Sequence, residues 1–338
     1  MSATAHPGLL RRYGLVTGVS LLVVIAAIMF GGPSVLLPII ALAAIEITFS
    51  FDNAVLNSQV LAKMSKIWRT LFLTVGIAIA VFGVRAILPL VLVSWASDNG
   101  LSQVLDQALH HPDVYAEELK SGYPIIAAFG GVFLLMVSLM FFGERKKVNW
   151  LKSIEKPLGN FNRPWLVSVT GATIAILLVY LVLSPGSNRI ALAGLLGALI
   201  FLAVKGVSGF LLSRSKNSAH HGLIQFVYLE LLDASFSFDG VVAAFAITKE
   251  VFLIVAGLGI GALYLRSMTL HLLEKGTLTN YRYLIHGAHY AILALSILLL
   301  AGIRFEVPEA VTGIIGLAII LVAFEGSRRH NKVTLTTV

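Results

Sequence analysis

The chain has 338 residues, of which 57% are hydrophobic and 12% are charged, and its formal net charge is +8. Apolar runs of about 20 residues, the length that crosses a bilayer, recur along it. Almost none of them has the polar face that a surface helix of a soluble protein needs. The composition therefore excludes a soluble globular fold and predicts an all-α polytopic membrane protein in the lipid bilayer. The absence of cysteine also excludes disulfides and thiolate metal ligands.

Hydropathy predicts about ten transmembrane helices in chain order, at residues 13–30, 35–55, 69–94, 123–142, 165–184, 190–213, 222–246, 251–270, 282–303 and 308–324. Most Lys and Arg residues fall on one side of this arrangement, whereas the long connection at about 95–122 on the other side is rich in acids. The positive-inside rule then predicts a cell-membrane protein with both termini in the cytoplasm. The basic excess lies beside anionic lipid and requires no nucleic-acid partner. The oligomeric state stays open, and a homo-oligomer is possible.

An internal duplication links the two halves of the chain. The stretch LDASFSFDGVV at 232–242 repeats IEITFSFDNAV at 45–55 without a gap, and the likeness continues from 76–86 to 257–267. Because each half holds five predicted spans, the matching spans should enter the membrane in opposite directions. The sequence thus predicts an inverted 5+5 repeat, the plan of many secondary transporters. Its parts are the N-terminal segment 1–12, a first repeat 13–184, a second repeat 190–326 and a cytoplasmic tail 327–338.

The acidic residues that we place within the hydrocarbon lie on the two matching helices, and they are Glu46, Asp52, Glu230, Asp233 and Asp239. A charge at the bilayer centre costs about 2.5 to 3.5 kcal/mol, so these acids need partners. In a straight helix Asp52 lies about 120° around from Glu46, and the two could not face one ion. We therefore expect a break near residues 50–53, or a site shared with the other copy. Gly240 offers a similar break beside Asp239.

The oxygen ligands available here suit a hard divalent cation. Carboxylate, amide and hydroxyl groups favour Mg²⁺, Ca²⁺ or Mn²⁺ over softer metals. The candidate metal ligands are Glu46, Asp52, Asn53, Glu230, Asp233 and Asp239. Candidate supporting residues are Ser50 and Ser237 as hydroxyl ligands or interhelical hydrogen-bonding groups, Arg85 and Arg266 as counter-charges or helix locks, and His286 and His289 as proton carriers or interfacial residues. No tightly bound cofactor is expected.

These residues resemble the signature of the TerC-like integral membrane proteins, a family named for tellurium resistance that includes bacterial manganese exporters. Its pattern Glu-x-x-x-Ser-x-Asp-Asn matches Glu46, Ser50, Asp52 and Asn53, and the following Gly-x-x-x-Ala with a later Arg matches Gly76, Ala80 and Arg85. In the second half Ser237, Asp239 and Arg266 match, while Asp233 replaces the Glu and Gly240 replaces the Asn. The resemblance covers mainly 40–90 and 228–270, and the chain is longer than the shorter TerC members. It implies export of a cation, above all Mn²⁺, through these acids.

The expected function is gradient-driven export of a hard divalent cation, with Mn²⁺ favoured, and no enzymatic activity. Two alternatives stay open. An accessory protein that senses or delivers metal could carry the same acids without moving the ion. An intramembrane aspartyl protease would also place aspartates on neighbouring spans, although the chain lacks the Gly-x-Gly-Asp element of that class.

Overall fold

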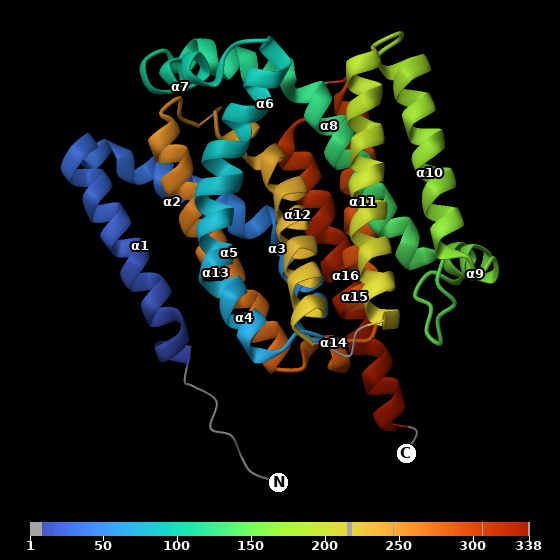
Figure 1. Ribbon diagram of the computed structural model, residues 1–338. Helices are drawn as coiled ribbons and strands as arrows, with labels where there is room; N and C mark the ends of the chain where they lie inside the picture. The colour runs from blue at the N-terminus through green and yellow to red at the C-terminus, as the bar shows by residue number, and fades with distance from the viewer. Residues whose placement is uncertain (1–8, 215–217, 246, 306, 337–338) are drawn as a thin grey trace.

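The computed structural model describes residues 9–214, 218–245, 247–305 and 307–336, and some side chains within these ranges are not described. Every regular element in these ranges is helical, and the helices run side by side as one bundle (Figure 1). Within the described ranges, eight helices are long and apolar enough to cross a membrane, or nine if the bent pair α2–α3 is one span. The all-α polytopic membrane fold is therefore confirmed.

The first half of the chain contains α1 (Leu9–Gly31), a short 3₁₀ turn η1 (Pro33–Val35), α2 (Leu36–Phe49) and α3 (Phe51–Leu61). A third span follows as α4 (Lys66–Leu73), α5 (Val75–Ala78), the π-helix η2 (Ile79–Ile87) and α6 (Leu88–Ser97). Then come α7 (Leu101–His110), α8 (Pro112–Phe142), α9 (Lys152–Asn160) and α10 (Pro164–Leu178), which continues as a second π-helix, η3 (Val179–Leu183).

The second half contains α11 (Asn188–Arg214), α12 (Ser218–Ala244), α13 (Val251–Glu274), α14 (Thr277–Asn280), α15 (Leu284–Gly302) and α16 (Glu309–Thr336). Helix α12 has 27 residues and carries the three acids Glu230, Asp233 and Asp239. Two boundaries differ from the prediction. The expected outer loop at 95–122 is mostly α7 and the first turns of α8, and the expected tail from 327 continues α16.

Matching elements of the two halves run in opposite directions. In Figure 1, α4–α6 rises toward the end of the bundle that holds α7, whereas α13 descends toward α14. The N-terminal end of α1 and the C-terminal end of α16 lie at the same end of the bundle, the end that holds α14 (Figure 1). This arrangement agrees with the antiparallel relation expected of an inverted repeat.

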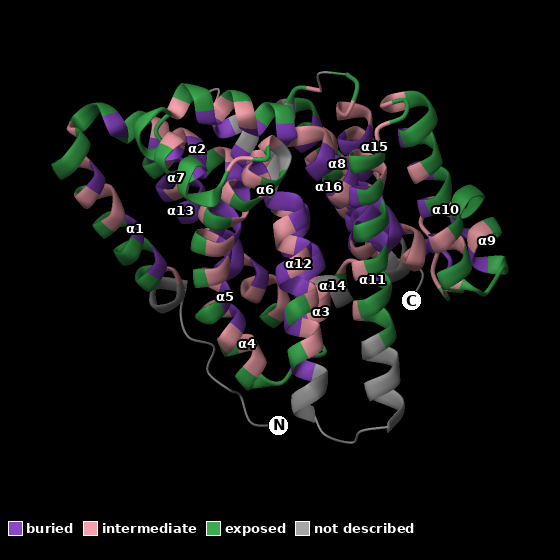
Figure 2. Cartoon of the chain, turned by 45° about the horizontal axis from the view of Figure 1, so that its top comes forward, coloured by how far each residue is buried: buried purple, intermediate pink, exposed green. Residues whose placement is uncertain are grey.

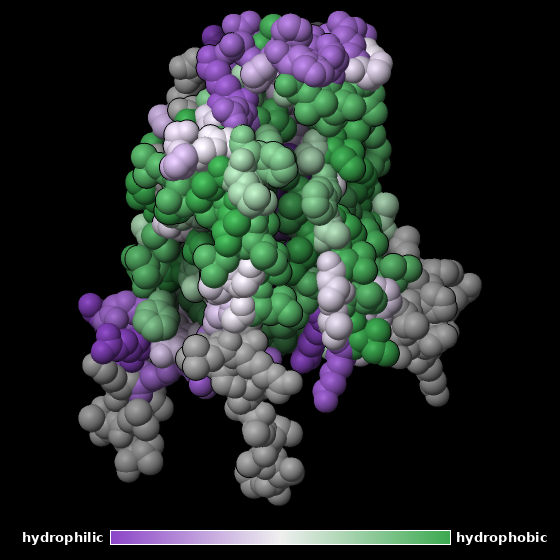
Figure 3. Space-filling view, turned by 90° about the vertical axis from the view of Figure 1, so that its left-hand side faces the viewer, coloured by the Kyte–Doolittle hydropathy of each residue, from purple (hydrophilic) through white to green (hydrophobic). Residues whose placement is uncertain are grey.

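One side of the bundle carries an apolar belt across its middle (Figure 3). Figure 3 shows hydrophobic residues across the middle of one side and hydrophilic residues gathered toward its two ends. The edge helices α1 and α10 are mostly exposed, whereas the central helices α8, α12 and α15 are largely buried (Figure 2). One core cluster joins α8, α10, α11, α12 and α15, with Phe133 and Phe201 in an edge-to-face contact at 5.8 Å between ring centroids. The belt is the surface expected of a protein solvated by lipid.

Candidate functional site: a pocket at a helix break

A break in the second span creates the opening of the candidate site. Helix α2 ends at Phe49 and α3 begins at Phe51, with Ser50 between them at φ −101° and ψ 20°. The two helical segments are bent by 53°. The Thr48 hydroxyl donates to the Ala44 carbonyl at 2.7 Å, a bond that often accompanies helix bending. The predicted interruption of the first acidic helix is thus confirmed.

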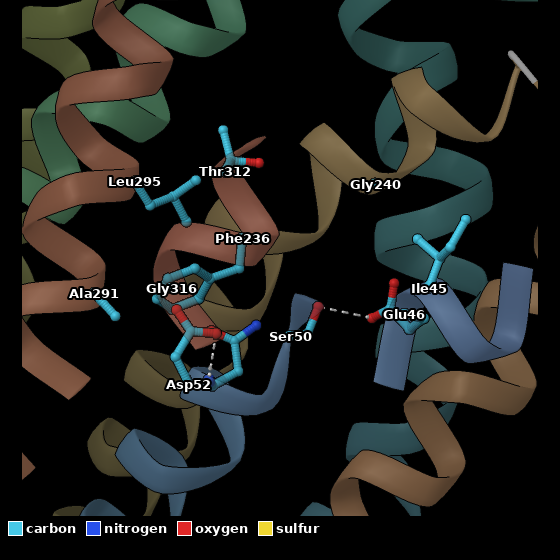
Figure 4. Close-up of a pocket in the computed structure, with 12 residues that line it drawn as sticks. Ile45, Glu46, Ser50, Asp52, Phe236, Gly240, Ala291, Leu295, Thr312 and Gly316 are labelled. Carbon is cyan, nitrogen blue, oxygen red and sulfur yellow. Dashed lines mark hydrogen bonds between the residues drawn. The ribbon is translucent and has the colours of Figure 1, made fainter. Parts of the chain in front are cut away.

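A small pocket of about 30 Å³ opens beside this break. Its lining comes from α2, α3, α12, α15 and α16, and the residues are Ile45, Glu46, Ser50, Asp52, Asn53, Phe236, Gly240, Ala291, Leu295, Thr312, Gly313 and Gly316. Figure 4 shows Glu46 and Asp52 on opposite sides of Ser50, with Asp52 lying toward Phe236 and Gly316. The volume can hold one or two water molecules or an ion that has lost part of its hydration shell.

Asp52 and Asn53 bring free oxygen ligands to this pocket. Asp52 is 6% exposed and Asn53 is 4% exposed. The backbone N–H of Asn53 donates to Asp52 Oδ1 at 3.0 Å, and the structure shows no cationic side chain paired with Asp52 in the part of the chain that it describes. The buried Oδ1 of Asn53 has no hydrogen-bond partner there either. Since a buried acceptor without a donor is costly, these oxygens are placed to receive a cation or water.

Glu46 reaches the same pocket but is already paired. Its Oε1 lies 2.5 Å from Arg85 Nη2, and the Ser50 hydroxyl donates to the same oxygen at 3.4 Å. Arg85 also donates to the Ala80 carbonyl at 2.8 Å within the π-helix η2, while its buried Nε has no hydrogen-bond partner among the residues that the structure describes. A side chain on Gly261 of α13 would collide with Glu46, because its Cβ would lie 2.5 Å from the Glu46 Cβ. The glycine therefore lets α13 pack against this ion pair.

The second copy holds its arginine with more contacts. Arg266 donates to both carboxylate oxygens of Glu230, at 3.1 and 3.0 Å, and to one oxygen of Asp233 at 3.1 Å. It also donates to the Phe72 carbonyl at 2.7 Å and lies over the Phe72 ring. Gly76 leaves room for this cluster, since a Cβ there would lie 2.3 Å from Arg266 Nη1. Here the acids serve a structural ion cluster.

Helix α12 is continuous from Ser218 to Ala244, so the break expected beside Gly240 is not present. Asp239 lies on this helix, but its side chain is outside the described part of the structure. Ser237 is 2% exposed, and its hydroxyl has no hydrogen-bond partner among the described residues. The second copy contributes Phe236 and Gly240 to the pocket wall.

The two arginine clusters lie close enough to interact. Asp233 acts electrostatically on both Glu46 and Arg85, and Glu230 acts on Arg85. Among the residues that the structure describes, no three carboxylate or imidazole side chains come together where they could hold one metal ion. Glu46, Asp52 and Asp233 thus do not form one carboxylate cage, because the arginines engage Glu46, Glu230 and Asp233 and leave Asp52 in the pocket.

A family model matches most of the chain. A family model described as "Protein of unknown function (DUF475)" matches residues 51–334. The chain belongs to this family. The match includes Asp52, Asn53 and the whole second copy, and it begins after Glu46. Searches of curated proteins and of solved structures found no match.

The two candidate histidines of this DUF475 protein, His286 and His289, do not line the pocket. His286 Nδ1 pairs with Glu155 of α9 at 2.9 Å. His289 bonds the Ile285 carbonyl at 2.9 Å and stacks on Phe141 with ring centroids 3.7 Å apart. Their contacts fix the packing of α15 against α8 and α9, and neither residue lines the pocket.

Sequence reasoning missed the contribution of α16. Thr312, Gly313 and Gly316 of the DUF475 chain complete the pocket, and a Cβ on Gly316 would lie 3.8 Å from Asp52 Oδ2. The signal was the spacing of small residues at 312, 313 and 316, a pattern that lets membrane helices approach closely. Glu155 was missed too, because it lies in a connection outside the predicted spans.

Proposed function

We propose that the protein is a membrane transporter that exports a hard divalent cation, with Mn²⁺ the favoured substrate. The observation that carries this proposal is the helix break that opens onto a buried pocket holding Asp52 and Asn53. Broken helices inside membrane proteins are typical sites of cation coordination, because carbonyl groups at the helix end are freed from the helical ladder. The direction of transport and the choice of Mn²⁺ come from the resemblance to TerC-like exporters.

The ligand set supports a hard cation without requiring several carboxylates. Asp52 offers a carboxylate, Asn53 an amide oxygen, and Ser50 and Thr312 offer hydroxyl groups at the same pocket. Mg²⁺, Ca²⁺ and Mn²⁺ accept such oxygens together with retained water. One unpaired carboxylate also suits transport, because an ion held too tightly would not leave.

In the proposed cycle, the cation enters from the cytoplasmic side and binds at Asp52 and Asn53. Glu46 lies at the other side of Ser50, so it can share the ion if its contact with Arg85 loosens. The two repeats then rock against each other and open the pocket outward. A proton arriving from outside neutralises Asp52 and discharges the ion, which makes an ion gradient the energy source.

The test is Mn²⁺ flux into liposomes that contain only the purified full-length protein. We expect Asp52→Asn to weaken Mn²⁺ affinity by at least about 10- to 100-fold, since even indirect supports of a metal ligand have effects of that size. The matched control is Asp106→Asn, which makes the same change at an exposed position on α7.

Two outcomes would contradict the proposal. Flux that is absent from the wild-type protein would favour an accessory role in sensing or delivery. Flux that survives Asp52→Asn unchanged would remove the pocket from the transport path. Replacing Mn²⁺ by Mg²⁺ or Ca²⁺ in the same assay identifies the substrate.

A further inference from the structure

Helix α9 lies across one end of the bundle rather than along it. It connects α8 to α10, and in Figure 1 it is seen nearly end-on beside the lower end of α10, while α10 and α11 run lengthwise. A helix at right angles to the spanning helices lies in the plane of the bilayer surface. This orientation is the one adopted by interfacial amphipathic helices.

One face of α9 is anchored to the protein through its only acid. Glu155 has a side chain that is 1% exposed, and it pairs with His286 at 2.9 Å. The backbone N–H groups of Trp150 and Leu151 donate to the same carboxylate at 3.2 and 3.3 Å. Gly159 packs against the Glu144 carbonyl, where a Cβ would lie 3.2 Å from the oxygen. The negative charge of the helix therefore points inward.

The opposite face is basic. The exposed cationic residues of α9 and its flanks are Arg145, Lys147, Lys152, Lys156 and Arg163, and the exposed acid in the stretch 143–163 is Glu144. Lys146 does not belong to this face, because its ammonium lies 3.0 Å from the centre of the Phe141 ring. The outward charge is thus strongly positive, and no side chain of the bundle pairs with it among the described contacts.

Large apolar side chains are exposed between these cations. Leu151 is 39% exposed, Ile154 43%, Phe161 65% and Trp165 55%. Trp165 stands in the first turn of α10, the depth at which tryptophan marks a membrane interface. Apolar groups that alternate with cations on one face suit a surface that offers acyl chains and phosphates together.

We propose that α9 and its flanks, residues 143–163, bind the headgroups of anionic phospholipids at the bilayer surface. The exposed cations contact the phosphates, while Ile154 and Phe161 enter the boundary between headgroups and acyl chains. A soluble acidic partner would match the charge alone, whereas the in-plane orientation and the exposed apolar residues match a bilayer. This inference does not depend on the transport proposal.

The experiment measures lipid binding to the full-length protein in detergent. Phosphatidylglycerol or phosphatidylcholine is titrated in, and the lipid molecules retained are counted by native mass spectrometry. The variant K152Q/K156Q/R163Q removes three exposed charges without touching Glu155. The matched control K63Q/K66Q/K275Q removes three exposed lysines at the same end of the bundle, outside α9.

We expect the α9 variant to lose about fivefold or more in phosphatidylglycerol affinity, since even one basic residue near an anionic surface has an effect of that size. The control should change less than about twofold, and phosphatidylcholine binding should stay the same in both variants. Equal losses in the two variants, or no loss in the α9 variant, would overturn the proposal. Because the altered side chains are exposed, circular dichroism should match the wild type.

Discussion

The two copies of the acidic motif have similar sequences and different structures. In the first copy the helix breaks at Ser50, and Arg85 bonds one carboxylate, that of Glu46. In the second copy α12 stays continuous, and Arg266 bonds Glu230, Asp233 and a backbone carbonyl. One copy thus opens a pocket while the other locks the bundle. The two matching helices therefore differ both in their ion pairs and in their local structure.

The local hydrogen bond at the break does not by itself explain this difference. Thr48 donates to Ala44 in the first copy, and the matching Ser235 donates to Leu231 at 2.8 Å in the second, yet that helix stays intact. The copies differ in the next contact. Ser50 donates to Glu46, whereas the shorter Asp233 is directed to Arg266 and the Ser237 hydroxyl stays without a described partner. Because Glu46 is longer than Asp233, it can accept a hydrogen bond from Ser50 at the helix break of the first copy.

The largest loss of stability should follow from removing Arg266, which pairs with two carboxylates. Arg266→Met leaves two buried carboxylates without their cation, and breaking a buried ion pair costs about 3 to 5 kcal/mol. Arg85→Met leaves one such carboxylate, so its loss should fall at the lower end of that range. Thermal unfolding in detergent measures both. Adding Glu46→Gln to Arg85→Met should restore part of the loss, and equal destabilisation by the two single variants would contradict the comparison.

A smaller loss of stability should follow from filling the space beside the ion cluster of Arg266. Gly76→Ala places a Cβ 2.3 Å from Arg266 Nη1 and 2.6 Å from Glu230 Oε1, so the cluster must shift. Overpacking of this kind typically costs about 1 to 3 kcal/mol. Gly18→Ala on α1 is the matched control, because its Cβ meets no atom within 4 Å. A Gly76→Ala variant as stable as the Gly18→Ala control would show that the cluster is not rigid.

In the first copy, removing the amide of Asn53 should change metal affinity more than stability. Asn53→Ala deletes an oxygen that has no described partner, so the free energy of unfolding should change by less than about 1 kcal/mol. Mn²⁺ affinity, measured by calorimetry, should nevertheless fall by about tenfold or more. Ser58→Ala, one turn further along α3, is a control that leaves the pocket lining intact. A large loss of stability with unchanged affinity would assign Asn53 to packing.

The last effect is local to α9. This helix lies between α8 and α10, whereas only residues 303–308 separate the matching helices α15 and α16. Burial raises the pKa of Glu155, but the bond with His286, the Leu151 N–H and nearby Lys146 outweigh it, so the net pKa lies below the ordinary 4.5. Because the pKa of Glu155 is lower in the folded protein, its ionised carboxylate stabilises the docked helix at pH values above the ordinary pKa. This stabilisation is lost as the pH falls through the pKa of the folded protein.

Hydrogen exchange in α9 should therefore stay slow at pH 4.5 and rise only at lower pH. Glu155→Gln should raise the exchange rate at neutral pH by about tenfold, because a bond to a charged group contributes about 1.5 to 3 kcal/mol. Glu117→Gln, at an exposed position, is the control. Exchange that is independent of pH in the wild type would show that the Glu155 contact does not hold α9.

The sequence by itself determined that the protein is solvated by lipid, and it determined the plan of the fold. Long apolar runs have to form helices in lipid, because the backbone must satisfy its own hydrogen bonds, and the repeated motif showed which helices correspond. It also identified Glu46, Asp52 and the two arginines as residues that need partners.

Only the tertiary structure decided which partner each charge received. That choice depends on contacts between residues far apart in the chain, such as Arg266 with Phe72 and Glu230, and Asp52 with the small residues of α16. Ion pairing lowers the cost of a buried charge only when distance and direction both fit, and these depend on how helices pack. The same motif could therefore line a pocket at a helix break in one repeat and form an arginine ion cluster in the other.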